Sequence, residues 1–429
     1  MGAATAPGAS RIRFLPVTPS RRVKQLLSGG GSIAVAMAIM NVATYGFTMA
    51  AARLLGPQAY GAFASLMATL LVISVLQLGL QATAARRIAA EPSHVAQIER
   101  TILGVTYRAS VALGVVLLLL TPVLNAVLRL DSMLTAALVS VVSVPFTMMG
   151  GQAGILQGER RWQALSVVYV LSGVPRLLIG TALIAWHPTE TAAIIGTGIG
   201  ACFPVVAGWW FLRRPRDAGV PTEEHGFRRV IRESFHNSHV LLAFFALSNV
   251  DIVIARNVLP EHDAGLYAGG LILTKAVLFL PQFVVVIAFP SMSTTGERRR
   301  ALTLSLGLVS VIGALVTLGA LLLPRLALVF VGGQQFEEIS THLWIFAVLG
   351  TVLSMLQLLV YSVLARQGQR SVYLVWGAFL TVVAVGLTTD SLRTLLTTVI
   401  LVDSVLLVVL LAVSLHVIRP ASDEEDVAA

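Results

Sequence analysis

The sequence predicts an all-α polytopic membrane protein with about twelve transmembrane helices in two six-helix bundles. Three observations lead to this prediction: long apolar segments, basic residues that alternate between loops, and a repeat shared by the two halves. Of the 429 residues, 56% are hydrophobic and only 12% are charged, and the mean hydropathy is +0.84. A soluble chain of this length needs a far more polar surface. We therefore expect a chain that crosses a bilayer many times.

Twelve apolar segments are long enough to cross about 30 Å of hydrocarbon at about 1.5 Å per residue. Turn residues or charged residues separate each segment from the next. The predicted helices cover residues 30–52, 60–83, 102–126, 132–155, 163–186, 190–212, 236–257, 264–289, 301–323, 341–364, 371–388 and 393–417.

The basic residues support this count and give an orientation. The formal net charge is +9, from 30 basic and 21 acidic residues. With the predicted helices, 22 basic residues fall on one side of the membrane, five fall on the other, and three lie within helices. Basic loops stay in the cytoplasm. We expect a protein of the cytoplasmic membrane with both termini in the cytoplasm, and we read the positive charge as topology control rather than nucleic-acid binding.

The charge pattern also divides the chain. A charged loop near the middle separates the halves, and four acidic residues lie close to the C-terminus. We predict a basic cytoplasmic N-terminal segment, an N-terminal six-helix bundle, a charged cytoplasmic linker, a C-terminal six-helix bundle and an acidic cytoplasmic tail, at residues 1–28, 29–212, 213–235, 236–418 and 419–429.

The two halves share local sequence at equivalent helices. Residues 52–64 resemble residues 255–268, and residues 157–160 resemble residues 367–370. Each half has six predicted helices, so both halves enter the membrane from the same side. The repeat is therefore parallel, with a pseudo-twofold axis along the membrane normal. Two such bundles leave a cleft between them, which is the architecture of an alternating-access transporter.

Motifs of catalysis are missing from the sequence. Neither lysine follows the glycine spacing of a phosphate-binding loop, and there is no zinc peptidase or nucleophile-elbow motif. Cys202 is the only cysteine, which excludes an internal disulfide. His236 and His239 have a spacing that suits a metal, but no third ligand is near, so we read them as polar residues at a membrane surface. We expect no enzyme activity, no catalytic residue, no metal site and no cofactor.

Two basic residues lie deep inside predicted helices of opposite halves. Arg176 lies about 15 Å and Lys275 about 16 Å from the outer ends of their helices. Charges at this depth are costly and mark functional sites. If both face the cleft, they form a cationic site that suits phosphate or pyrophosphate. The alternative is that each pairs with a carbonyl or carboxylate within its own half.

Asp251 is the acid that we select inside a predicted helix, about 9 Å from its outer end. It is a candidate for binding a coupling proton or sodium ion, or for neutralising Lys275 or Arg176, and these alternatives stay open. Five amides are candidates either for lining the cleft and binding sugar hydroxyls or for joining helices. They are Asn41, Gln77, Gln81, Asn249 and Gln282.

Several local stretches resemble one family along nearly the whole chain. Residues 53–63 resemble the first hairpin of polysaccharide-biosynthesis flippases of the Wzx type, and residues 156–161 resemble the segment after the fourth helix. Similar matches in the second half are residues 249–251, 264–268, 289–290, 330–332 and 335–338. The chain thus resembles the multidrug/oligosaccharidyl-lipid/polysaccharide exporter superfamily.

The resemblance implies a function and partners. Members of the polysaccharide branch are thought to move undecaprenyl-pyrophosphate-linked oligosaccharides from the cytoplasmic to the outer leaflet, and their aspartate of the seventh helix corresponds to Asp251. The expected partners are the lipid-linked oligosaccharide, membrane lipids and other polysaccharide-assembly proteins, but no nucleic acid. The lipid II branch commonly has two further helices, which disfavours it here.

Three alternatives to the flippase remain. The nearest is a cation-coupled multidrug exporter on the same fold. Less favoured are a membrane polysaccharide polymerase or ligase, which usually needs a large outer loop with catalytic residues, and a scaffold for polysaccharide assembly.

Overall fold

A computed structural model describes residues 21–213, 227–292, 298–365 and 370–417. Most of the predicted N-terminal segment, residues 214–226 of the predicted linker and the predicted acidic tail lie outside the described residues. The described residues form helices and contain no strand. The first half contains α1 (Arg21–Ala90), η1 (Pro92–His94), α2 (Val95–Leu119), α3 (Thr121–Leu128), α4 (Met133–Gly158), α5 (Trp162–Trp186) and α6 (Glu190–Leu212). The second half contains α7 (Phe227–Val258), α8 (Glu261–Met292), α9 (Arg298–Leu322), α10 (Pro324–Val331), η3 (Gln334–His342), α11 (Leu343–Ala365), α12 (Arg370–Gly386) and α13 (Leu392–Val417).

The helices confirm an all-α protein of the membrane-spanning class. Within the described residues, nine helical stretches are long and apolar enough to cross a bilayer, and Ser371–Gly386 is a shorter apolar helix. Many large apolar side chains on these helices face outward, among them Val42, Leu178 and Leu315. Lipid tails rather than water are the solvent that suits such a surface.

A break at Gly56 divides α1 into the two segments that the sequence predicts at 30–52 and 60–83. Gly56 has a φ of 71° and a ψ of 173°, and Pro57 follows it inside the helix. The positive φ favours glycine, because a side chain there is strained. A Cβ on Gly56 would also lie 2.9 Å from the Gln335 side chain. The break lets α1 form a hairpin within one helical element.

Several predicted boundaries differ from the structure, and α1 itself begins at Arg21, nine residues before the predicted start at residue 30. The predicted helix 102–126 is divided between α2 and α3 near Leu120. The predicted loop at 324–340 contains the short helix α10 and the 3-10 helix η3. The predicted linker is helical from Phe227 onward, because α7 begins nine residues earlier than the apolar pattern alone indicates.

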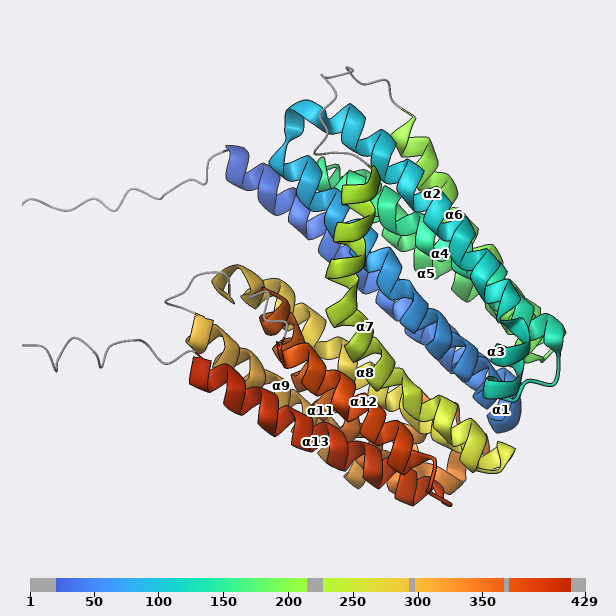
Figure 1. Cartoon of the computed structure of the whole chain (residues 1–429). Helices are drawn as coiled ribbons and strands as arrows, with labels where there is room; N and C mark the ends of the chain where they lie inside the picture. Colours follow the sequence, from blue (N-terminus) through green and yellow to red (C-terminus); the bar gives the residue numbers. More distant parts are fainter. Residues whose placement is uncertain (1–20, 214–226, 293–297, 366–369, 418–429) are drawn as a thin grey trace, which may run out of the picture.

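Figure 1 shows α2–α6 with α1 in one group and α8–α13 in a second group. Helix α7 packs against α1 and α12, and α1 also packs against α8, so the groups meet along α1, α7 and α8. The start of α1 and the end of α13 both lie at the left of Figure 1. We call the opposite end of the helices, which carries Gly56, Leu130, Pro260 and Gly333, the hairpin end.

Candidate functional site

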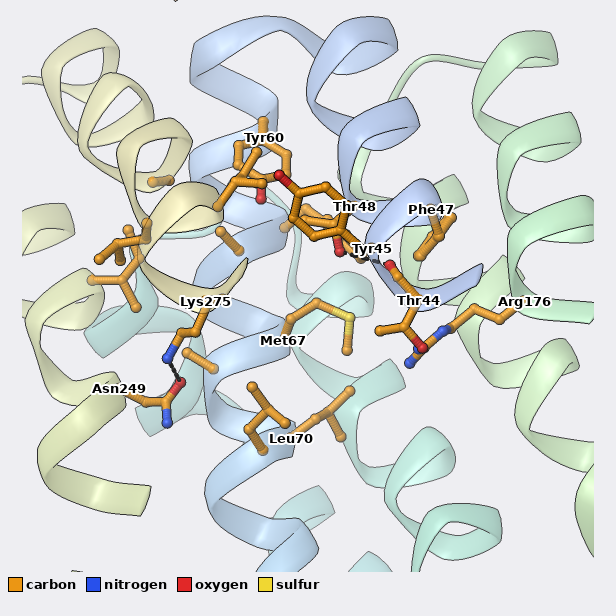
Figure 2. A pocket seen from close by; sticks show the side chains of 18 of the residues that line it. Thr44, Tyr45, Phe47, Thr48, Tyr60, Met67, Leu70, Arg176, Asn249 and Lys275 are labelled. Atoms are coloured by element: carbon orange, nitrogen blue, oxygen red, sulfur yellow. Dashed lines mark hydrogen bonds between the residues drawn. The ribbon is translucent and has the colours of Figure 1, made fainter. Parts of the chain in front are cut away.

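A cavity of about 160 Å³ lies where the two helix groups meet. Its wall comes from both segments of α1, from α4 and α5, and from α7 and α8. Most of the wall is apolar, and Met67 and Leu70 lie between its two basic residues in the view of Figure 2. Arg176, Asn249, Asp251 and Lys275, all selected from the sequence, line this cavity.

Arg176 enters the cavity from α5. Its Nη2 donates a hydrogen bond of 2.6 Å to Thr44 Oγ1, and its guanidinium carbon lies 5.9 Å from the centre of the Phe47 ring. Its Nε is buried and has no hydrogen-bond partner among the described residues. A guanidinium has five N–H donors, so most of its hydrogen-bonding capacity is left for a ligand.

The position of Arg176 follows from close packing of α5. A Cβ on Gly200 of α6 would lie 2.7 Å from the Arg176 Cα, and a Cβ on Gly173 would lie 2.9 Å from the Met40 carbonyl oxygen on α1. Small residues let membrane helices approach this closely. Glycines therefore fix α5 between α1 and α6 and aim Arg176 at the cavity.

Lys275 enters from α8 on the other side of the cavity, next to Asn249 (Figure 2). Its Nζ donates hydrogen bonds of 2.8 Å each to the Ser248 carbonyl oxygen and to Asn249 Oδ1. Asn249 is oriented in turn, because its Nδ2 donates to the Phe245 carbonyl oxygen at 2.8 Å. An ammonium group has three donors, so one N–H of Lys275 remains for a ligand.

Asp251 of α7 also lines the cavity and is almost fully buried. Its Oδ1 accepts the Ile252 backbone N–H at 2.9 Å, and its Oδ2 accepts the Tyr267 hydroxyl at 3.1 Å. Asp251 and Lys275 interact electrostatically. Of the partners considered from the sequence, Lys275 rather than Arg176 is therefore the basic residue close to Asp251.

Asp403 on α13 is a second buried acid that we did not select from the sequence. It is fully buried, and neither carboxylate oxygen has a hydrogen-bond partner among the described residues. It interacts electrostatically with both Asp251 and Tyr267. The signal was present, since Asp403 stands inside the apolar segment 393–417.

Aromatic side chains form the wall toward the hairpin end. Tyr45, Phe47, Tyr60 and Phe63 line the cavity, and the Phe47 and Phe63 rings meet edge to face at 5.7 Å. These residues have no sequence signal of their own, because aromatic residues also occur throughout membrane helices. They make this part of the wall mostly apolar, and the Phe47 ring lies beside Arg176.

The other predicted amides whose side chains the structure describes do not line this cavity. Gln81 donates to Gln157 Oε1 at 3.0 Å and to the Tyr169 hydroxyl at 2.9 Å, which joins α1 to α4 and α5. Asn41 and Gln77 are half-buried residues of α1 elsewhere on that helix. The side chain of Gln282 lies outside the described part of the structure, as does that of His236.

Comparison with known proteins gives a family and a fold. The profile of the family described as polysaccharide biosynthesis protein matches residues 26–296. No curated protein matches the sequence.

Solved structures of transporters match nearly the whole chain. An inward-facing multidrug-resistance MATE transporter of the MOP superfamily is 16% identical, with a TM-score of 0.71 and coverage of 92% of this chain and 96% of that one. A MATE protein in complex with MaL6 is 13% identical, with a TM-score of 0.66 and coverage of 91% and 96%. A MOP superfamily transporter from Pyrococcus furiosus, described as having a binding pocket of reverse polarity, is 15% identical, with a TM-score of 0.62 and coverage of 91% and 95%. At these identities the likeness shows a shared fold.

Proposed function

Because the chain belongs to the polysaccharide biosynthesis protein family and has the fold of MATE transporters, we propose that it is a lipid-linked oligosaccharide flippase. In this proposal it moves an oligosaccharide on polyprenyl pyrophosphate from the cytoplasmic to the outer leaflet, for cell-surface polysaccharide synthesis. A charged, hydrated head group cannot cross hydrocarbon unaided. The protein provides a polar site for the head group while the lipid tail stays in the bilayer.

The observation that carries the proposal is the pair of basic residues in one cavity. Arg176 comes from the first helix group and Lys275 from the second, and both line the same space. Arg176 has no acidic partner among the described residues, whereas Lys275 keeps one N–H for a ligand. Such donors form strong, charge-assisted hydrogen bonds with phosphate oxygens.

The size of the cavity also favours a small anionic head group. Pockets for drug-sized ligands have volumes of about 300–1,000 Å³, and this cavity has about 160 Å³. That volume suits a diphosphate better than a whole oligosaccharide. We therefore place the pyrophosphate in the cavity and the sugars outside it, between the helix groups.

The mechanism that we propose is alternating access. The chain then spans the membrane twelve times, with the break at Gly56 separating the first two spans, and its halves form two bundles related by an axis along the membrane normal. The bundles correspond to residues 29–212 and 236–418, with cytoplasmic segments at 1–28, 213–235 and 419–429. Both termini are cytoplasmic in this topology, so the hairpin end faces outward.

Asp251 is our candidate for coupling transport to an ion gradient. It interacts electrostatically with the cavity lysine and with the buried Asp403, and the Tyr267 hydroxyl donates a hydrogen bond to it. A proton or sodium ion that binds to these acids changes the electrostatic potential at the Lys275 ammonium group. Ion binding and anion release are thereby linked through one lysine.

The second candidate function is a cation-coupled multidrug exporter, which the structural similarity to MATE transporters favours. A pocket for cationic drugs should present acids to its ligand. Here the cavity lining contains one acid, Asp251, and two basic residues, Arg176 and Lys275, whereas Asp403 of α13 is not part of the lining. The Pyrococcus furiosus protein described with a reverse-polarity pocket is a precedent for a different function on this fold.

The test is a flipping assay with the full-length protein in proteoliposomes. A fluorescent polyprenyl-pyrophosphate oligosaccharide is the substrate, and chemical quenching from one side reports its leaflet. We expect flipping of this lipid and no transport of a cationic dye under imposed proton, sodium and voltage gradients. Dye transport without lipid flipping would instead support the exporter.

A further inference from the structure

The hairpin end contains two arginines at equivalent places in the two halves. Arg53 lies near the end of the first segment of α1, and Arg256 lies near the end of α7. They are 203 residues apart in the sequence. The first residues of the short helices α3 and α10 have the same separation, and so do their last residues. Gln58 and Glu261, which bond to each other across the groups, have this separation as well.

Each arginine reaches the short helix of the other half. Arg256 donates from Nε to the Leu128 carbonyl oxygen at 3.1 Å and from Nη2 to the Arg129 carbonyl oxygen, at the end of α3. Arg53 donates from Nη2 to the Val329 carbonyl oxygen at 2.9 Å, near the end of α10. The contacts are reciprocal between the two helix groups.

Neighbouring side chains add to both contacts. Asn257 Nδ2 donates to the Val127 carbonyl oxygen at 2.7 Å, and the Tyr45 hydroxyl donates to the Phe330 carbonyl oxygen at 3.2 Å. The last carbonyls of a helix have no partner within it and carry the negative end of its dipole. A guanidinium is a well-suited partner for such a group.

The geometry points to a clasp that holds the hairpin end shut and opens during transport. In this clasp Arg53 of α1 binds the end of α10, and Arg256 of α7 binds the end of α3. The acceptors are backbone carbonyls at the ends of short helices, so water can replace the arginines when the helix groups separate. The two contacts are unequal, because Arg256 is only 5% exposed and makes two hydrogen bonds, whereas Arg53 is exposed and makes one. Arg256 is therefore the stronger half of the clasp.

This inference rests on the alternating access of the proposed flippase, but its test needs no substrate. Replacing the only cysteine by Cys202→Ser gives a background for two spin labels, at His187→Cys after α5 and Asp390→Cys after α12. Both sites are exposed, lie at the hairpin end and belong to different helix groups. Pulsed electron paramagnetic resonance then measures the distance distribution between the labels in full-length protein.

We expect the parent protein to populate mainly the short distance, and Arg256→Ala to lower the ratio of short to long distances about tenfold, since hydrogen bonds from charged groups are strong. Arg53→Ala should have a smaller effect in the same direction. Arg256→Lys should lie in between, because lysine keeps the charge without the two-pronged geometry. Arg325→Ala is the matched control, an exposed arginine of α10 that should leave the ratio unchanged.

An unchanged distribution in Arg256→Ala, with helical content and elution volume like the parent, would overturn the clasp. If Arg256→Ala does not fold, Arg53→Ala and Asn257→Ala each remove one hydrogen bond between the helix groups, and unchanged distributions in both would overturn the clasp equally. Lipid flipping can fail while these distances respond as expected, so the two proposals are tested separately.

Discussion

Lys275 Nζ lies 2.8 Å from Asn249 Oδ1, which holds the cavity lysine on the α7 side of the site. The amide is itself fixed by the Phe245 carbonyl oxygen and the Ser248 hydroxyl. A chain of fixed partners keeps a charged donor in one orientation before the ligand arrives, which lowers the entropic cost of binding.

The first prediction concerns this amide. Asn249→Ala removes the acceptor that positions Lys275, and we expect binding of polyprenyl pyrophosphate to weaken about tenfold, given the usual strength of a hydrogen bond to a charged group. Tryptophan fluorescence titration in detergent measures the affinity. Gln81→Ala is the control, an amide of α1 that does not line the cavity. Equal affinity in Asn249→Ala and the parent would exclude a positioning role for Asn249.

The second prediction concerns ion coupling. Asp251→Asn removes a buried carboxylate that interacts with Lys275, and we expect the stimulation of flipping by an imposed ion gradient to be lost while gradient-free flipping persists. Asp403→Asn should act in the same direction, because the two acids interact. Flipping rates with and without proton or sodium gradients are the measurement. The exposed Asp131→Asn is the control, and full gradient stimulation in both buried variants would remove these acids from the mechanism.

The third prediction concerns the contact between α1 and α8. A Cβ on Gly265 would lie 2.1 Å from the Pro57 carbonyl oxygen, so Gly265→Ala forces the two helices apart. Overpacking of this kind destabilises proteins by about 1–3 kcal/mol, and we expect a lower midpoint of thermal unfolding in detergent. Gly307→Ala on α9 is the control, because no atom beyond the glycine's own stretch of helix lies within 4 Å of its Cβ position. Equal midpoints for the two variants would contradict this tight contact.

Patterns that extend over many residues were predictable from the sequence. Apolar segments gave the all-helical membrane class, and local motifs gave the family that the profile match confirms. Gly56 was visible as a Gly-Pro turn between two such segments. Depth along a helix also selected Arg176 and Lys275, which line one cavity, although their role in binding stays a prediction.

Features set by short segments or by packing were harder to predict. Helices α3 and α10 are only eight residues long, so α3 merged with a predicted span and α10 with a predicted loop. The basic start of α7 has too few apolar residues to be predicted as part of a span. The structure extends α7 through it, and Glu233 in this part forms ion pairs with Arg86 and Arg87 of α1. Contacts of this kind depend on which helices become neighbours, and periodicity does not contain that information.

The most direct test of the central claim compares three variants in the proteoliposome flipping assay. We expect Arg176→Ala and Lys275→Ala each to slow flipping of the pyrophosphate-linked lipid at least tenfold, as the loss of a charged donor implies. Arg108→Ala, an exposed basic residue of α2 outside the cavity lining, should flip the lipid like the parent protein. Parent-like flipping in both cavity variants, with folding intact, would contradict a cationic cavity that binds the pyrophosphate.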